Sequence, residues 1–195
     1  MGRYHRAVQA VMDSDEALML RYAAGDEAAF RELFARWAAP LLRMLRRNVN
    51  RDVDAQDLTQ QTFLQLHRAR RDFRADMRLR PWIITIALNL ARDHLRRRGR
   101  RPESSLDEGT FVEPSVPPAV GGEAEDVAQR VRLALADLPR EQREVIELHW
   151  FEQLSFPEIA GIVGATPGAV RVRAHRGYVA LRARLGDDGH NLAKT

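Results

Sequence analysis

The stretch from Ser155 to Leu185 holds the residues whose types and spacing best suit chemical recognition. Between Thr166 and Leu185 there are five arginines and no acidic residue. An arginine guanidinium can donate two parallel hydrogen bonds to a guanine edge, and it also binds phosphate oxygens. These residues favour binding of a nucleic acid, although a solvated basic face on an ordinary bundle helix would have a similar composition.

Two helix-start signals, eleven residues apart, position these arginines. Ser155 and Glu158 have the spacing of a capping box. Thr166 followed by Pro167 is typical of an N-cap with proline at the first helical position, and Gly164 eases the turn between the two helices. The pattern predicts a helix-turn-helix.

The second helix of this motif has two faces at the helical period of about 3.6 residues. The side expected to pack inward comprises Val170, Ala174, Gly177, Tyr178, Leu181 and Leu185. An exposed valine on the other side can touch a thymine methyl group. The candidate DNA-contacting residues are Thr166, Arg171, Val172, Arg173, His175 and Arg176.

The net charge of +4 hides a strong segregation along the chain. Residues 14–101 contain 19 arginines against 11 acidic residues, whereas residues 102–126 contain seven acidic residues, four prolines and no basic residue. Such an acidic segment cannot bury enough apolar surface to fold, so we expect a flexible linker. Two interpretations stay open: an inert tether, or an acidic strand that lies in a basic channel of a partner or across the basic domains.

Helical periodicity on both sides of this linker predicts an all-α protein of two small helical domains. In the first domain we expect Asp26 and Asp54 to cap two helices, and a third helix to run from about Pro81 to Arg98. In the second, two helices separated by Pro139 precede the helix-turn-helix. The expected boundaries are an N-terminal tail at 1–13, domains at 14–101 and 127–188, the linker at 102–126 and a C-terminal tail at 189–195.

Several classes of protein are disfavoured by composition. The chain has no cysteine, and its six histidines and scattered acids lack the spacing of a metal site or of a nucleophile with a base. We therefore expect no metal, no cofactor and no enzymatic activity. No apolar run approaches the length of a membrane span, and the N-terminus is a poor signal peptide, so we expect a cytoplasmic protein without membrane insertion.

Taken together, three stretches resemble a sigma factor of the sigma-70 superfamily, in the small extracytoplasmic-function (ECF) group that has only domains 2 and 4. They are DAQDLTQQTFLQLHRA at 54–69, PWIITIALNLARDHLRRR at 81–98, and the stretch from 135 to 185 that includes the helix-turn-helix. The resemblance implies that the first stretch binds the clamp helices of the largest RNA polymerase subunit. It also implies that the second engages and opens the minus-ten promoter element, that the third reads the minus-thirty-five element, and that the linker threads through the polymerase.

The resemblance implies specific polymerase-binding residues on one helical stripe. The family usually has a glutamate where Gln61 stands, so this contact is expected to be weaker here. The polymerase-binding candidates are Asp57, Gln60, Gln61 and Leu64.

Minus-ten recognition is assigned by the same resemblance to residues around the third helix. Asn89 stands where family members use asparagine, and the loop at 72–80 stands where they hold a flipped-out base. Trp82 is either a stacking wedge or, as we favour, a core residue. The candidates for minus-ten binding and melting are Phe73, Arg74, Met77, Asn89, Arg92, Arg96, Arg97 and Arg98.

The recognition helix departs from the common family pattern GTVKSRLHRA, since this chain reads GAVRVRAHRG at 168–177. Two hydroxyl groups are lost, at Ala169 and Val172, and arginine replaces lysine at Arg171, where it can make a bidentate base contact, so promoter preference should differ. The chain is thus expected to be a promoter-specificity subunit that binds RNA polymerase core and promoter DNA, under the control of an anti-sigma factor. The alternative is a sigma-like interaction protein that titrates an anti-sigma factor without binding promoters.

Overall fold

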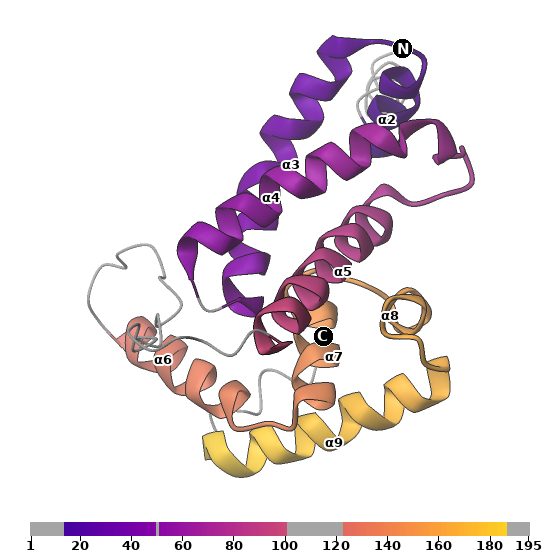
Figure 1. Ribbon diagram of the computed structural model, residues 1–195. Coiled ribbons are helices and arrows are strands. Elements are labelled where there is room, and N and C mark those ends of the chain that lie inside the picture. The colour runs from indigo at the N-terminus through magenta and orange to yellow at the C-terminus, as the bar shows by residue number, and fades with distance from the viewer. Residues whose placement is uncertain (1–13, 50, 101–122, 187–195) are drawn as a thin grey trace. The chain divides into compact units, whose positions relative to one another are not determined.

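The computed structural model of the protein describes residues 14–49, 51–100 and 123–186. Within these ranges every regular element is helical and no strand occurs. The chain divides into two compact units, Met1–Ser115 and Val116–Thr195. The predicted all-α class with two small helical domains is therefore confirmed, and Figure 1 shows the helices of each unit.

The first unit is built from helices α2 (Asp15–Ala23), α3 (Glu27–Asn48), α4 (Asp52–Arg68) and α5 (Leu79–Arg100), with a short 3-10 helix η1 (Arg70–Asp72) before the loop that leads to α5. The long helices α3, α4 and α5 pack against one another, and α2 packs on α3 (Figure 1). Their shared core includes Leu33, Leu41, Leu45, Leu66, Ile83 and Ile84, each at most 1% exposed. Burial of these apolar stripes holds the candidate side chains on the outer faces.

One of the two predicted caps in this unit is confirmed and the other is wrong. The Asp26 carboxylate accepts hydrogen bonds from the backbone N–H groups of Ala28 and Ala29, at 2.9 and 3.3 Å. By contrast, α4 begins at Asp52, after Arg51, and Asp54 lies inside its first turn. As the third residue of α4, Asp54 is not at the N-cap position, and its carboxylate accepts a 2.9 Å hydrogen bond from Arg98 on α5.

The third helix of this unit is longer than predicted. It begins at Leu79, so Pro81 occupies its first turn, where the missing N–H of proline costs no helical hydrogen bond. It ends at Arg100 rather than Arg98.

The second unit is the four-helix module that the sequence predicts. It consists of α6 (Glu123–Ala136), α7 (Arg140–Trp150), α8 (Phe156–Val163) and α9 (Pro167–Leu185). Because α6 begins at Glu123, residues 123–126 of the predicted linker are helical. The rest of that linker and the two predicted tails at 1–13 and 189–195 lie outside the described residues, so the proposed boundaries stay predictions.

The helix-turn-helix has the local chemistry expected of it. The Glu158 carboxylate accepts a 2.8 Å hydrogen bond from the Ser155 N–H, and the Ser155 hydroxyl accepts in return from the Glu158 N–H, which completes the capping box. Gly164 ends α8 with a φ of +65°, the left-handed conformation that favours glycine. The Thr166 hydroxyl then caps α9 by accepting from the Ala169 N–H at 3.2 Å.

Candidate nucleic-acid interface

Helix α9 presents a basic face that is separate from its packing face. Val170, Ala174, Gly177 and Leu181 are buried, and Tyr178 and Leu185 are half-buried, as the helical pattern predicts. The opposite side is exposed and comprises Arg171, Val172, His175 and Arg176, with Val172 50% exposed. Thr166 is also exposed at the start of the helix. An exposed apolar side chain among arginines suits the mixture of base edges and methyl groups in a major groove.

Arg173 stands apart from the other candidates on α9. Its guanidinium lies 3.0 Å from the Glu141 carboxylate of α7, and the arginine side chain is only 31% exposed. The side chain is thus directed toward α7 and helps to hold α9 against it.

The arginine-rich end of α5 has two faces. Asn89, Arg92 and Arg96 lie on one of them, where the Arg92 guanidinium donates to the Asn89 side-chain oxygen at 3.2 Å. Arg96 lies 3.0 Å from the Asp93 carboxylate, one turn away on the same helix. Arg97 is exposed.

The other face of α5 is tied to α4 through Asp54. The Asp54 side chain is 16% exposed, and its carboxylate lies 2.9 Å from Arg98 and 3.3 Å from His94. His94 and Arg98 are spaced one turn apart, so a single carboxylate meets both. Sequence reasoning assigned Asp54 to a cap and did not single out His94, because His94 and Arg98 are 40 and 44 residues from Asp54 in the chain.

In the loop between η1 and α5, one candidate is a core residue. Phe73 is 4% exposed and its ring centroid lies 5.3 Å from that of Trp82. The expectation that Phe73 contacts a base is therefore not supported, because its ring is covered by the protein. Trp82, half-buried against Phe73, fits the favoured interpretation as part of the core.

The tip of the same loop is a small exposed turn. The Met77 N–H donates to the Arg74 carbonyl at 3.0 Å, and the Arg74 N–H lies 3.4 Å from the Met77 sulfur. The Arg74 guanidinium lies 3.1 Å from the Asp76 carboxylate, and its hydrogen bond holds the pKa of Asp76 below the ordinary value. Arg74 and Met77 are therefore together at the loop tip, as candidates for contact with an opened strand.

The exposed stripe of α4 has a different character. Asp57, Gln60, Gln61 and Leu64 are all exposed, with Leu64 at 48%. No basic residue occurs from 53 to 64. A stripe with one carboxylate and no cation does not attract phosphate, so it suits contact with a protein rather than with DNA.

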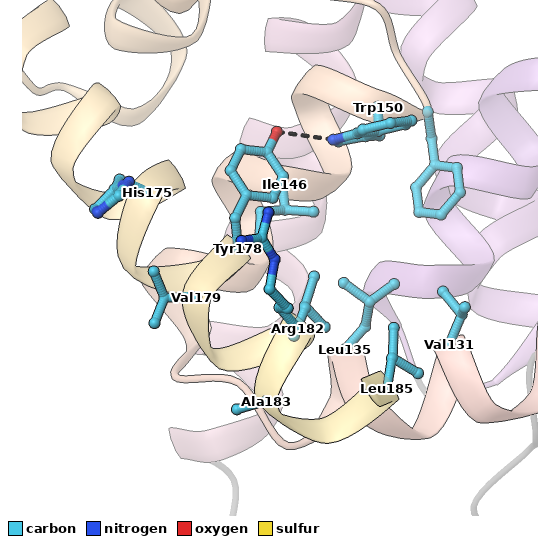
Figure 2. Close-up of a pocket in the computed structure, with 12 residues that line it drawn as sticks. Val131, Leu135, Ile146, Trp150, His175, Tyr178, Val179, Arg182, Ala183 and Leu185 are labelled. Atoms are coloured by element: carbon cyan, nitrogen blue, oxygen red, sulfur yellow. Dashed lines mark hydrogen bonds between the residues drawn. The ribbon is translucent and has the colours of Figure 1, made fainter. Parts of the chain in front are cut away.

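An apolar groove of about 570 Å³ lies on the second unit among α6, α7 and α9 (Figure 2). Its lining includes Val131, Leu135, Ile146, Trp150, Phe151 and Tyr178. The Trp150 indole N–H donates to the Tyr178 hydroxyl at 2.7 Å, and burial raises the pKa of Tyr178. Sequence reasoning missed this groove because its residues come from three helices whose packing no single periodicity reveals.

Within the described residues, no group of three or more histidine, cysteine or acidic side chains is placed to hold a metal ion. Over the same part of the chain, none of the helices combines the length and apolar character needed to cross a membrane.

Comparison with known proteins matches both units in order. Residues 33–101 match the family model for sigma-70 region 2, and residues 128–181 match that for sigma-70 region 4. RNA polymerase sigma factor CarQ of Myxococcus xanthus is 39% identical over 87% of this chain and 96% of its own length. The ECF RNA polymerase sigma-E factor of Escherichia coli strain K12 is 30% identical over 86% of this chain and 92% of its own length.

Two solved structures are also similar to this chain. CnrH in complex with the cytosolic domain of CnrY matches with a TM-score of 0.65 and 31% identity, covering 90% of this chain and 99% of that one. The sigma factor RpoE in complex with the anti-sigma factor NepR from Bartonella quintana matches with a TM-score of 0.66 and 28% identity, covering 82% and 98%. The chain belongs to the ECF group of RNA polymerase sigma factors, the subunits that direct RNA polymerase to promoters.

Proposed function

We propose that this sigma factor divides its task among three exposed surfaces. The α9 face reads the minus-thirty-five element, the α5 end with the loop before it engages the minus-ten element, and the α4 stripe attaches to the polymerase clamp helices. The observation that carries this proposal is the contrast in charge, since the two DNA surfaces are rich in arginine and the α4 stripe has none. The chain performs no covalent chemistry itself and acts with the polymerase in the cytoplasm.

At the upstream element, the outward side chains of α9 make both kinds of contact that DNA recognition needs. Arg171 and Arg176 donate to base edges or phosphates, and Val172 offers an apolar contact for a thymine methyl group. His175 on α9 and Thr166 at the start of the helix are exposed as well. Arg173 contributes by fixing α9 on α7 through its ion pair with Glu141.

At the downstream element, Asn89 and Arg92 form one hydrogen-bonded pair toward the DNA, and Arg96 and Arg97 add phosphate contacts. Arg74 and Met77 at the loop tip meet the opened strand. Arg98 reaches a phosphate only by leaving the Asp54 carboxylate, so we assign it mainly to anchoring α5 on α4.

The proposed control is an anti-sigma factor that covers the α4 stripe and enters the apolar groove among α6, α7 and α9. One similar structure is of a sigma factor in complex with an anti-sigma factor, and another is of CnrH with the cytosolic domain of CnrY. The α4 stripe and the groove are both accessible in this chain. The alternative function, titration of an anti-sigma factor without promoter binding, is less well supported. A pure titrant gains nothing from exposed arginines on two separate helices.

Run-off transcription with purified core polymerase on a randomised promoter library tests the proposed function. We expect the chain to select templates that share two sequence elements at a fixed spacing. Core polymerase that is active with another sigma factor but initiates nowhere with this chain would contradict the proposal.

Attachment to the polymerase should depend on the α4 stripe. We expect Leu64→Asp to weaken binding to core polymerase by about tenfold or more, because an exposed apolar side chain that the polymerase would cover is replaced by a charge. Fluorescence anisotropy of labelled sigma factor titrated with core measures this change. Leu133→Asp on α6 is the matched control, since Leu133 is 59% exposed and Leu64 is 48% exposed. If Leu64→Asp and Leu133→Asp weakened binding to core polymerase equally, the result would contradict a specific role of the α4 stripe in the interface.

A further inference from the structure

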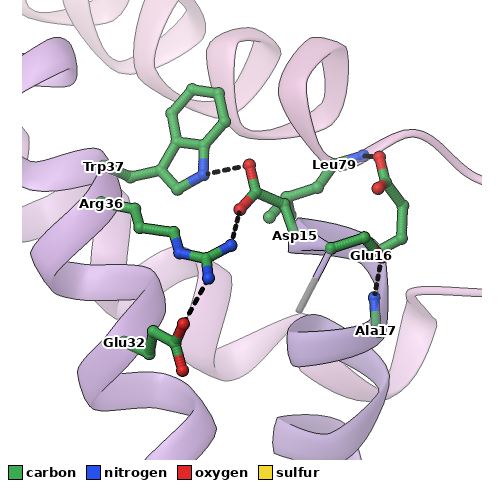
Figure 3. Close-up of polar contacts among 8 residues, drawn as sticks. Asp15, Glu16, Ala17, Glu32, Arg36, Trp37 and Leu79 are labelled. Atoms are coloured by element: carbon green, nitrogen blue, oxygen red, sulfur yellow. Dashed lines mark hydrogen bonds and ion pairs between the residues drawn. The ribbon is translucent and has the colours of Figure 1, made fainter. Parts of the chain in front are cut away.

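The exposed loop between η1 and α5 is held at both ends by the protein. At its first end, the Phe73 ring is buried against Trp82. At its second end, the backbone N–H of Leu79 donates a 3.1 Å hydrogen bond to the Glu16 carboxylate of α2 (Figure 3). Glu16 and Leu79 are 63 residues apart in the chain, so this contact is a feature of the fold that no local motif reveals.

Glu16 occupies the place of a helix cap for α5. The first N–H groups of an α-helix have no partner within the helix, and the N-terminus carries a partial positive charge. A carboxylate there satisfies one donor and interacts favourably with the helix dipole. The same carboxylate oxygen lies 3.5 Å from the Arg78 guanidinium, so Glu16 meets both the last loop residue and the first helical residue.

The neighbouring carboxylate on α2 has a different task. Asp15 accepts hydrogen bonds from the Trp37 indole and the Arg36 guanidinium of α3, each at 3.0 Å (Figure 3). Asp15 thus fastens α2 to α3, whereas Glu16 reaches the loop and α5. The two adjacent acids provide a natural comparison, because both belong to the first turn of α2 and only one touches the loop.

The consequence concerns the exposed turn at the loop tip. A short turn has its position in space set by its two ends, and the tip from Arg74 to Met77 is closed by its own hydrogen bonds. Loss of the Glu16 contacts would free Arg78 and the Leu79 N–H while the Leu79 side chain stays buried, so the turn would sample more positions relative to α5. Binding of the DNA strand would then have to order this turn, and the entropy lost in doing so would weaken binding.

We propose that Glu16 is a positioning residue for promoter opening, which holds the loop tip in place for an unpaired base by capping α5. This inference rests on the proposed function of the loop. Glu16 itself does not contact DNA, since its carboxylate is occupied by Leu79 and Arg78 and would repel phosphate.

Promoter opening by the holoenzyme tests the proposal. The probe is a duplex promoter, taken from the library selection, with 2-aminopurine in its minus-ten element, whose fluorescence rises on unpairing. We expect Glu16→Ala to slow opening by about fivefold to tenfold, because a helix cap is lost. Glu16→Gln should recover most of the rate, since its amide oxygen still accepts from Leu79. Glu16→Asp keeps the charge but is too short to reach that N–H, so it should resemble Glu16→Ala.

Asp15→Ala is the matched control. We expect it to lower the thermal stability of the protein, but the folded holoenzyme should open the promoter at the normal rate. Opening by Glu16→Ala and Glu16→Asp at the rate of Asp15→Ala would overturn the inference. If Glu16→Ala does not fold, the comparison of Glu16→Gln with Glu16→Asp decides the same question. Failure of the wild type to open any promoter would instead count against the proposed function.

Discussion

Replacement of Gly177 by leucine should lower the free energy of unfolding of the second unit by about 3 kcal/mol or more, because an overpacked core forces side chains and backbone apart. A Cβ atom at this position would stand only 2.5 Å from the Cδ1 atom of Ile146 on α7 and 3.4 Å from the Gln142 Cβ. Ile146 is itself 3% exposed, and it also lines the apolar groove. Since α9 is held against α7 at this close approach, its DNA face should lose its fixed position as well.

Native-state hydrogen exchange of the full chain, read by mass spectrometry, measures this effect separately in each unit. Amides of α7 and α9 should exchange faster in Gly177→Leu, whereas those of α3 and α4 should not change. A double-mutant cycle of Gly177→Ala with Ile146→Val tests the contact more directly. Ile146→Val removes the Cδ1 atom, which lies closest to the methyl group added at position 177. The double variant should be more stable than the sum of the two single changes predicts. Strict additivity would show that close packing of these two residues does not limit α9.

The parts of the fold that the sequence predicted correctly depend on partners close together in the chain. The capping box of Ser155 with Glu158, and the Thr166 cap before Pro167, join residues within three positions of one another. Whether these caps form depends only on local backbone geometry. Asp54 shows the limit of such reasoning. It stands where a cap is plausible, but its carboxylate bonds to Arg98 of another helix, 44 residues away.

The candidate surfaces follow the same division. Helical periodicity was enough to place Asp57, Gln60, Gln61 and Leu64 on one exposed stripe of α4, and to separate the two sides of α9. Periodicity could not reveal that Phe73 packs on Trp82 or that Arg173 pairs with Glu141, since both depend on how distant helices meet. Composition is enough to predict an exposed loop or a basic helix. Whether a single residue such as Phe73 is buried depends on tertiary packing.

Arg171 should determine which base pair is preferred at one position of the upstream element. We expect Arg171→Ala to reduce discrimination there by about fivefold to 150-fold, which corresponds to the 1–3 kcal/mol of a bidentate contact. Arg171→Lys should lose nearly the same discrimination while it keeps phosphate affinity, because an ammonium group lacks the planar fork of a guanidinium. Selection of promoters by the holoenzyme from a randomised library, followed by sequencing, measures the preference at every position.

Two control variants separate readout of a base from loss of charge. Arg184 is exposed on the same helix, and its guanidinium lies 3.6 Å from Asp137 and 3.4 Å from the Ala180 carbonyl. Because Arg184 is outside the proposed DNA face, Arg184→Ala should leave the selected sequence unchanged. Asn89→Ala should alter the downstream element and leave the upstream one intact. A shift of sequence preference in Arg184→Ala as large as that in Arg171→Ala would mean that α9 binds DNA by charge alone. A shift of sequence preference that occurs only in Arg171→Ala and Arg171→Lys would show that the Arg171 guanidinium recognises one base pair.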